Sequence, residues 1–589
     1  MSVTPKNSET GIRKKNLMYL TLLAMWGFSL AWFNPRLLSL LLLPGAESIP
    51  AKISLILFIL CLDVFWLFGS YHIVMFLFSL LSKNRAPPHS VATVVEPKVA
   101  ILYVTRNDFK YEAAYSCVDQ EYGNYHVFIL DDSTDRDYMA EVDRFHSLFG
   151  DKTSVIRRET RKGFKAGSLN NALRNSITDF PYFAVTDSDG IMPLDFLKKL
   201  MPYFRLDSTI AFVQAANKPN PAQTSKFATD LSLGILPLWN SYYPPRNDYG
   251  LVIFLGHGGI VRRDVWEVIG GFPEIVSEDL AFSIKIRELG YQGYFVSEVQ
   301  CFEDFPETYR QLRKQQEKYV KGGCQYILSY LGSFLKSSCP RWFEKLDLLL
   351  WCSSLLLPAF YIFFLFLFCL LLPLFFGEAR VLTLSVLGSE VHLWTTYPLS
   401  EGFHSIWTWD FYAVTILMMF APVLGCLRIA VSQPWKTLRL LSLSCVAYLS
   451  LMVVSAVGVL TFFLTRKAEW AVTGDRSGAP VADGYAEGSE AGVSWLDGLN
   501  STHGLVFGIE LLLGLLFTYG CLRTLNLGLL AFSLPLLLGP FVYKYGWDNK
   551  ALAFLAPFPF LVLVIAMGTL GLNLWGLQGA FLFFFPVHF

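Results

Sequence analysis

Acidic residues follow two strand-like runs of the sequence. Asp131 and Asp132 end the run YHVFILDD, and Asp187 and Asp189 end the run YFAVTDSD. The carboxyl ends of parallel strands meet at one edge of a sheet, so we expect these four carboxylates to lie there together. Their mutual repulsion calls for a cation or a set of hydrogen-bond donors. Oxygen ligands of this kind favour Mg²⁺ or Mn²⁺, and either ion prefers to share its coordination with a diphosphate.

Each of these acids also has an ordinary structural interpretation, because an Asp at a strand end commonly caps a helix or forms a turn. Two such pairs favour the chemical interpretation. A basic, glycine-containing segment, RKGFKAGSLNNAL (161–173), adds Lys162 and Lys165 at a loop-to-helix start. Backbone N–H groups, the helix dipole and an ammonium group can hold phosphate there, although such a segment can equally form a solvated turn.

A second pair of acids, Glu278 and Asp279, precedes an apolar pattern that predicts an amphipathic helix over 280–291. Acids in the first turn of a helix stabilise it, which is the structural interpretation. The chemical interpretation makes Asp279 a general base that takes a proton from an acceptor hydroxyl. Both interpretations stay open at the level of the sequence.

The segment EDFPETYRQLRKQQEKYVKGG (303–323) predicts another helix. Its Gln315, Lys318 and Tyr319 are three and four residues apart, so they share one face. Tyr319 can stack on a sugar ring and Lys318 can meet phosphate. An amphipathic helix that lies on a bilayer would have the same pattern.

The composition indicates a membrane protein. The chain has 589 residues, of which 53% are hydrophobic and 16% charged, and its mean hydropathy is +0.41. The formal net charge is zero, which argues against a nucleic-acid partner. Ten cysteines are scattered without zinc-ligand spacing, and we interpret them as reduced core residues.

Long apolar runs predict seven membrane spans, or eight if an ambiguous run is counted. The ambiguous run has basic residues at both ends, which favours a helix that lies along the cytosolic surface of the membrane. Arg13 precedes the first run and Lys83 follows the second, which places the N-terminus and the segment after residue 82 in the cytosol. The first run is predicted to be an anchor, not a cleaved signal peptide. The runs are 17–44, 52–82, 347–376, 409–432, 439–464 (the ambiguous one), 504–522, 527–546 and 551–575.

Between the second and third runs, short apolar strands alternate with amphipathic segments, which predicts an α/β domain with a mainly parallel sheet covered on both faces. The predicted divisions are an N-terminal segment with two transmembrane helices (1–95), the α/β domain (96–325), interface and transmembrane helices (326–465), a loop rich in Gly, Ala, Ser and Asp (466–503) and C-terminal transmembrane helices (504–589).

Six elements in this order, LDD, KAGSLN, DSD, FLGHGG, SED and QQEKY, resemble the signature of the membrane-integrated family 2 glycosyltransferases. That group contains the cellulose, hyaluronan and mannan synthases. The resemblance covers about 230 residues, and its specificity comes from the order and spacing of the elements. It implies a GT-A catalytic domain, a Rossmann-like mixed sheet, at the cytosolic face of a helical transmembrane bundle.

The resemblance also implies roles for individual residues. The donor would be held by Asp131, Asp132, Lys165, Asp187, Lys318 and Thr473, the metal by Asp189 with Asp187, and the acceptor by Gln315, Tyr319 and His257; Asp279, beside Glu278, would be the base. Thr473 belongs to AEWAVTGD (468–475), which is similar to the gating loop of the family. Lys318 and Tyr319 stand where the family has Arg and Trp, and Asp475 stands near its usual basic residue.

The resemblance leaves two functions open. The first is a processive synthase that uses a nucleotide sugar and Mg²⁺ or Mn²⁺ to extend a glycan, a β-glucan from UDP-glucose by default, and secretes it through its own spans. GDP-mannose is the rival donor. The second is the transfer of one sugar to a polyprenyl phosphate or glycolipid. In either case we expect an integral protein of the plasma (inner) membrane with a cytosolic catalytic domain. A fused cyclic-dinucleotide domain is not expected, and a catalytically dead subunit is disfavoured by the acids at 131, 187, 189 and 279.

Overall fold

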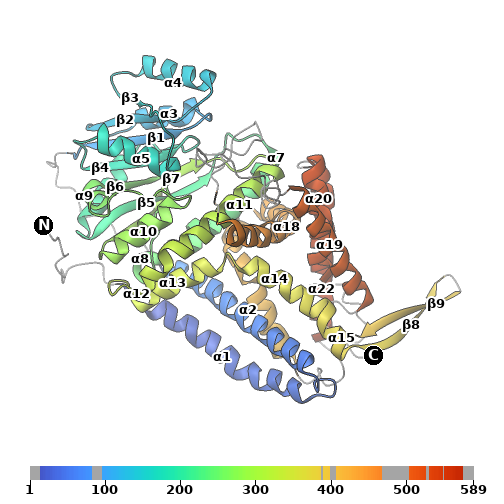
Figure 1. The fold of residues 1–589 in the computed structure, drawn as a ribbon. Coiled ribbons are helices and arrows are strands. Elements are labelled where there is room, and N and C mark those ends of the chain that lie inside the picture. The colour runs from blue at the N-terminus through green and yellow to red at the C-terminus, as the bar shows by residue number, and fades with distance from the viewer. Residues whose placement is uncertain are drawn as a thin grey trace.

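The computed structural model describes residues 14–82, 96–386, 389–397, 406, 408–466, 468, 503–524, 529–547 and 550–574. Figure 1 shows an α/β domain at one end and long helices that extend away from it. A two-stranded hairpin, β8 (Glu378–Val386) with β9 (Ser389–Tyr397), projects from the end of the helices opposite the α/β domain.

The α/β domain is built on a seven-stranded mixed sheet with the strand order β3-β2-β1-β4-β6-β5-β7. Strands β1 to β4 pair in parallel, β6 is antiparallel to both β4 and β5, and β5 is parallel to β7. The strands are β1 (Val99–Thr105), β2 (Tyr125–Asp131), β3 (Thr153–Ile156), β4 (Tyr182–Asp187), β5 (Ile210–Pro219), β6 (Gly259–Arg262) and β7 (Gln292–Glu303).

Helices cover both faces of this sheet, which explains why its strands are apolar along their whole length. Alternate residues of β1 enter opposite cores: Ile101 packs with one layer of helices, and Leu102 packs with the other. The first layer contains α3 (Tyr111–Val118), α4 (Arg136–Leu148) and α6 (Phe196–Leu200), and the second contains α5 (Phe164–Asn175), α9 (Arg263–Val268) and α10 (Glu278–Glu288).

Strand register fixes where the predicted acids stand. Thr105 of β1 pairs with Asp131 of β2, and Val104 of β1 pairs with Asp187 of β4. The two Asp residues therefore end strands on either side of β1. Two strand spacings separate them, about 10 Å.

Among the described residues, six helical segments are long and apolar enough to cross a membrane, by length and composition: Leu17–Leu42, Ile49–Leu81, Leu357–Phe376, Trp409–Ser432, Pro434–Thr465 and Val506–Arg523. They contain α1 (Leu17–Ser39), α2 (Ile49–Leu81), α14 (Leu357–Phe366), α15 (Leu372–Phe376), α16 (Trp409–Phe420), α17 (Leu427–Ser432), α18 (Pro434–Thr465) and α19 (His503–Arg523). The remaining helices are α7 (Lys226–Leu231), α8 (Arg246–Tyr249), α11 (Tyr309–Tyr326), α12 (Gly332–Lys336), α13 (Trp342–Ser353), α20 (Leu530–Tyr545), α21 (Lys550–Leu555) and α22 (Pro557–Leu574).

Helix α18 contains the run whose location was ambiguous, and it touches the α/β domain along its length. Near its start Arg439 Nε lies 3.0 Å from an oxygen of Asp230 in α7. Further on, Gln316 of α11 donates a hydrogen bond of 2.9 Å to Ser455. Near its end Phe462 packs with Val320 of α11. Helix α18 also packs against α14 and α20. Its position along the membrane surface and the number of spans, seven or eight, stay predictions.

Buried ion pairs join the α/β domain to the first two long helices and to α13. The Arg246 side chain, 1% exposed, makes a two-pronged pair with Asp347 and donates a further hydrogen bond to the Tyr71 hydroxyl. Glu344 pairs with Arg287 of α10 and lies 3.8 Å from Lys14, just before α1. We call this set of residues, 14, 71, 246, 287, 344 and 347, the junction network.

Candidate active site

The carboxyl end of β4 meets the first turn of α5. Helix α5 begins after Gly163, whose φ of 80° is a left-handed conformation that favours glycine. Its Lys165 forms an ion pair with Asp187 and donates a 3.0 Å hydrogen bond to the Gly256 carbonyl. Burial alone would raise the pKa of Asp187, but the charges of Lys165, His257 and Lys318 and the Lys165 hydrogen bond together outweigh it, and the pKa is lowered. Asp187 is therefore held ionised.

A glycine turn, the FLGHGG motif, connects this pair to α10. Gly256 and Gly258 have φ of 80° and 65°, so both positions favour glycine. A Cβ atom on Gly256 would lie 3.3 Å from Asp279 Oδ2 and 3.5 Å from Lys165 Nζ. The space that a side chain at position 256 would fill therefore borders both the ammonium of α5 and the carboxylate of α10.

Glu278 and Asp279 form the first turn of α10, as predicted. Asp279 Oδ1 accepts a 2.8 Å hydrogen bond from the backbone N–H of Leu280, and its other oxygen faces the glycine turn. Burial raises the pKa of Asp279. Burial and the adjacent Asp279 charge raise the pKa of Glu278 to about 8. The two neighbouring acids therefore hold a proton more tightly than separate, exposed carboxyl groups would.

Asp189 follows β4 in a loop that other polar groups hold in place. Ser188 donates a 2.7 Å hydrogen bond to Asp108, and the Tyr103 hydroxyl donates to the Ser188 carbonyl. In the part of the chain that the structure describes, no Lys, Arg or His lies within ion-pair distance of Asp189. Burial and the charge of Asp187 raise the pKa of Asp189. Its carboxylate is thus a partly buried acid without an ion-pair partner among the described residues, and the more distant charges of Lys110 and His257 only partly offset the rise.

The acids that end β2 have arginine partners instead. Arg157 Nε lies 2.7 Å from Asp131, and Arg158 makes a two-pronged pair with Asp132. Arg158 also donates to the carbonyls of Lys162 and Phe164, so Asp132 fixes the loop before α5. Of the two expected ways to offset the repulsion of these acids, a cation or a set of donors, the structure shows arginine donors at this pair, from side chains that follow β3.

A further polar cluster lies at the end of β7. His257 of the glycine turn has Nε2 3.3 Å from Glu303, and Asn217 of β5 donates a 3.1 Å hydrogen bond to the same carboxylate. Burial raises the pKa of Glu303 to about 7. His257 was predicted from the sequence, whereas Glu303 and Asn217 were not. The signal for Glu303 was the position of EDF after a strand-like run, the same signal that identified Asp131 and Asp187.

Helix α11 brings two of its three predicted residues toward this site. Lys318 is near enough to Asp187 and Glu278 for their charges to affect its pKa, although burial has the largest effect and lowers that pKa. The Lys318 ammonium lies 6.0 Å from the ring centre of Tyr319, which is 54% exposed. Gln315 stands one helical turn earlier on the same face. Thr473, the predicted gating-loop residue, lies outside the described residues.

The sequence reasoning also missed residues that organise the end of β1. Asp108 accepts hydrogen bonds from Thr105 and from the Arg106 backbone, and burial raises its pKa to about 6. Lys110 forms an ion pair with Asp304, which links the β1 loop to the end of β7. No motif in the sequence singles out these residues, because each is defined by a partner far along the chain.

The described ranges contain no group of three or more His, Cys, Asp or Glu side chains that could hold a metal ion alone. The residues present fit the other common arrangement, in which one or two carboxylates share the ion with substrate phosphates. Asp189, which has no ion-pair partner within those ranges, is the carboxylate suited to that role.

Residues 182–377 match the family model Glycosyl transferase family group 2. This match begins at β4 and includes the DSD, FLGHGG, SED and QQEKY elements. Residues 182–377 therefore match a family 2 glycosyltransferase domain, and the resemblance noted in the sequence is confirmed over that range. The mixed sheet and the long apolar helices likewise confirm the fold class, a GT-A domain within a membrane protein.

A curated relative is the probable glucomannan 4-beta-mannosyltransferase 15 of Arabidopsis thaliana. It is 24% identical over 305 residues, which are 50% of this chain and 56% of the relative. The chain thus spans about half the length of this relative.

Two solved structures show more distant likeness. The mannosyltransferase PcManGT from Pyrobaculum calidifontis, in complex with GDP-Man and Mn²⁺, is 16% identical, and the match covers 69% of this chain and 98% of that one with a TM-score of 0.45. S. aureus TarS 1–349, in complex with UDP-GlcNAc, is 15% identical, and the match covers 46% of this chain and 81% of that one with a TM-score of 0.27. Both TM-scores are low, so the fold class rests on the sheet and the family match.

Proposed function

We propose that this protein is an inverting hexosyltransferase that takes a sugar from a nucleotide donor and extends a polysaccharide at the face that bears the α/β domain. The observation that carries the proposal is the meeting of Lys165, Asp187 and Asp279 around the glycine turn. A cation for the diphosphate and a base for the acceptor thus lie against the same glycine of this turn. That proximity is what a transfer from diphosphate to hydroxyl requires.

The donor half of the site is the start of α5 with the end of β4. Backbone N–H groups of the first turn of α5 and the Lys165 ammonium present positive charge to a diphosphate. Lys318, from α11, adds a second ammonium near Asp187. When the diphosphate departs, these two cations stabilise the negative charge that develops on it.

A divalent ion, Mg²⁺ or Mn²⁺, would be held by Asp189 with help from Asp187. When bound, such an ion neutralises charge on the leaving diphosphate. The proposal rests on the carboxylate of Asp189, which has no cationic partner among the described residues.

The acceptor half of the site is the start of α10 with the exposed face of α11. Asp279 takes the proton of the attacking hydroxyl as that oxygen bonds to the anomeric carbon and the nucleoside diphosphate leaves. Burial raises the pKa of Asp279, which strengthens it as a base. Tyr319 offers an exposed ring on which a sugar can stack, and Gln315 and His257 offer hydrogen bonds nearby.

We propose two candidates for the donor sugar. UDP-glucose is the default for the resemblance, whereas the name of the Arabidopsis relative favours a mannosyl donor. The two sugars differ at one hydroxyl group, so a few polar contacts suffice to discriminate them. Incubation of the purified protein with GDP-mannose, UDP-glucose and UDP-N-acetylglucosamine, scored by released nucleotide, tests this choice directly.

The product is proposed to be a β-linked chain that leaves through the spans, with the catalytic domain in the cytosol at the plasma (inner) membrane. The alternative is transfer of one sugar to a polyprenyl phosphate or glycolipid. Radiolabelled donor separates the two, because a processive enzyme yields high-mass product that a glycosidase digests. Product that extracts wholly into organic solvent would support the alternative, and donor hydrolysis without any transfer would refute both.

A further inference from the structure

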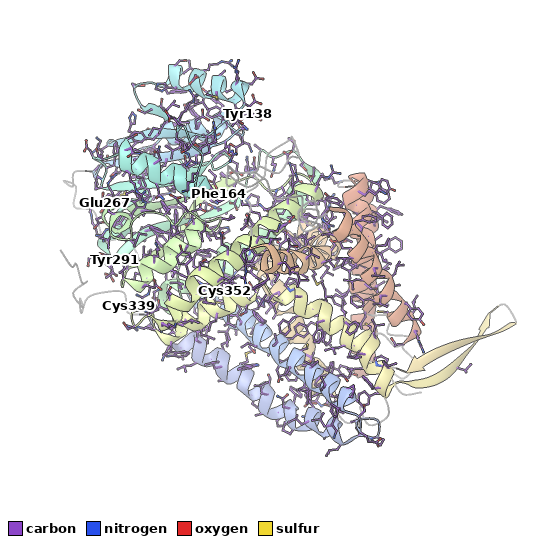
Figure 2. The ribbon with its side chains drawn as sticks, in the orientation of Figure 1. Tyr138, Phe164, Glu267, Tyr291, Cys339 and Cys352 are labelled. Atoms are coloured by element: carbon purple, nitrogen blue, oxygen red, sulfur yellow. The ribbon has the colours of Figure 1, made fainter. Side chains whose placement is uncertain are left out.

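A cavity of about 900 Å³ lies between the α/β domain and the long helices. Its lining is mostly aliphatic and aromatic, as shown by Phe68, Leu238, Trp351, Phe420, Leu441 and Phe532. No residue of the donor or acceptor site lines it. Figure 2 labels Cys352, which follows Trp351 in α13, where the α/β domain meets the helices.

The α/β domain closes one side of the cavity. Gly234, Pro237, Leu238 and Tyr242, all from the segment between α7 and α8, form this wall. The other walls come from α2, α16, α18 and α22. The cavity is therefore at the level where the helices meet the α/β domain, near the surface of the membrane that they would cross.

The cavity is partly open, and long apolar helices form much of its wall. Three of its lining residues keep a large accessible fraction: Val423 (38%), Tyr448 (36%) and Val564 (49%). They belong to the segment after α16, to α18 and to α22. Because these helices are apolar, the medium outside this opening is hydrocarbon rather than water.

Several polar groups of the lining already have partners within the protein. His72 and Tyr242 are hydrogen-bonded to each other, and the Tyr71 hydroxyl accepts a 2.7 Å hydrogen bond from Arg246. A sugar chain would leave most of its hydroxyls unpaired here, which is costly in an apolar environment. A hydrocarbon chain has no such groups and gains from contact with the lining.

We propose that this cavity binds the hydrocarbon chain of a membrane lipid, taken from the leaflet next to the α/β domain. The volume lies within the usual range for small-molecule sites, roughly 300–1,000 Å³. Trp351 forms part of the wall and packs on the same buried cluster as Leu255, the residue before Gly256. A bound chain would thus reach within one packed layer of the glycine turn. The site does not depend on the proposed transfer reaction.

The test measures lipid retained by the full-length protein. Protein is purified in mild detergent from bilayers of palmitoyl-oleoyl-phosphatidylglycerol and -phosphatidylethanolamine, washed, and analysed by native mass spectrometry and organic extraction. We expect about one lipid per chain, as one pocket predicts. Ser444→Trp places an indole in the cavity and should reduce retention at least about fivefold by exclusion. Leu460→Trp, on the exposed side of the same helix, should leave it unchanged.

A second measurement covers the case in which Ser444→Trp fails to fold. A photoreactive benzoylphenylalanine replaces Leu441 inside the cavity or, as control, the exposed Leu460. After washing, position 441 should crosslink to lipid and position 460 should not. The mass of the adduct assigns the chain as acyl or prenyl, and either result supports the site. Retention of detergent alone, or equal lipid in wild type and a folded Ser444→Trp, would overturn it.

Discussion

Buried charged groups occur in two regions of this molecule, and the two regions differ in whether each acid has a basic partner. In the junction network, Asp347 faces Arg246 and Glu344 faces Arg287, so each acid has a two-pronged basic partner. At the edge of the sheet, Asp189 has no such partner in the described part of the chain, and Glu278 lies against another acid. The first arrangement lowers the pKa of Glu344, although burial opposes this, and the second raises the pKa of Glu278.

The difference separates charges that hold the domains together from charges that can do chemistry. A buried pair that satisfies both partners is structurally committed, and its loss leaves an uncompensated charge. A buried acid with a raised pKa is not neutralised by a basic side chain, so it can still bind a proton or a cation. Such groups therefore cluster at functional sites. The acids at 131 and 132 belong with the first kind, although the sequence grouped them with the second.

The largest effect is expected for the base. Asp279→Asn should reduce hexose transfer by about 10²–10⁴-fold, because the acceptor hydroxyl then keeps its proton. Donor binding, measured by calorimetry with the nucleotide sugar, should change little. Asp264→Asn, at an exposed acid in the first turn of α9, is the matched control. Loss of donor binding together with transfer would assign Asp279 to the donor instead.

Breaking the junction network should act on stability. Arg246→Met leaves Asp347 buried without its partner and should lower the free energy of unfolding by about 3–5 kcal/mol. The exposed pair Lys198–Glu121 gives the comparison, since Lys198→Met should cost less than about 1 kcal/mol. Thermal unfolding in detergent measures both. Equal shifts for the two variants would show that burial of the Arg246 pair has no special role.

The raised pKa of Glu278 predicts a dependence of stability on pH. Its pKa is about 8 in the folded protein against an ordinary value of 4.5, so the folded state binds this proton more tightly than the unfolded state. Stability from this group is complete below about pH 4.5 and is lost as the pH rises through about 8. Glu278→Gln should therefore flatten the fall in thermal midpoint between those values. Glu267→Gln, at an exposed acid, should keep the wild-type slope.

A smaller effect is expected at the acceptor face. Tyr319→Ala should raise the KM for a short oligosaccharide acceptor about tenfold, because a stacked sugar loses its aromatic surface. Tyr319→Trp should restore or improve it, since the indole is the larger platform. The kcat with saturating acceptor should change much less than KM. A fall in kcat alone, with KM unchanged, would contradict the stacking role.

Much of the fold could be read from the sequence because its pattern is strong. Runs such as VAILYVT are apolar throughout, so they could only be strands covered on both faces, and β1 is such a strand. Asp187, Asp279 and Lys165 were found for a related reason: each stands at the end of a strand or the start of a helix, where position along the chain fixes position in space.

The partners of those residues could not be read in the same way. Arg158 pairs with Asp132, and Glu303 pairs with His257, across separations that no local pattern encodes. The buried pair of Arg313 in α11 with Glu510 in α19 spans 197 residues. Such contacts depend on how the elements pack, so the sequence showed the acids but not which of them were already neutralised.

The central claim is that Asp189, the acid at the sheet edge without an ion-pair partner, helps to hold the donor. Calorimetric titration of the purified protein with GDP-mannose and with UDP-glucose, in Mn²⁺ and then in a chelator, tests it most directly, with Asp189→Asn alongside. We predict that one donor binds in Mn²⁺, and that binding weakens at least about tenfold in chelator and to a similar extent in the variant. Equal binding by wild type and Asp189→Asn in Mn²⁺ would contradict the account.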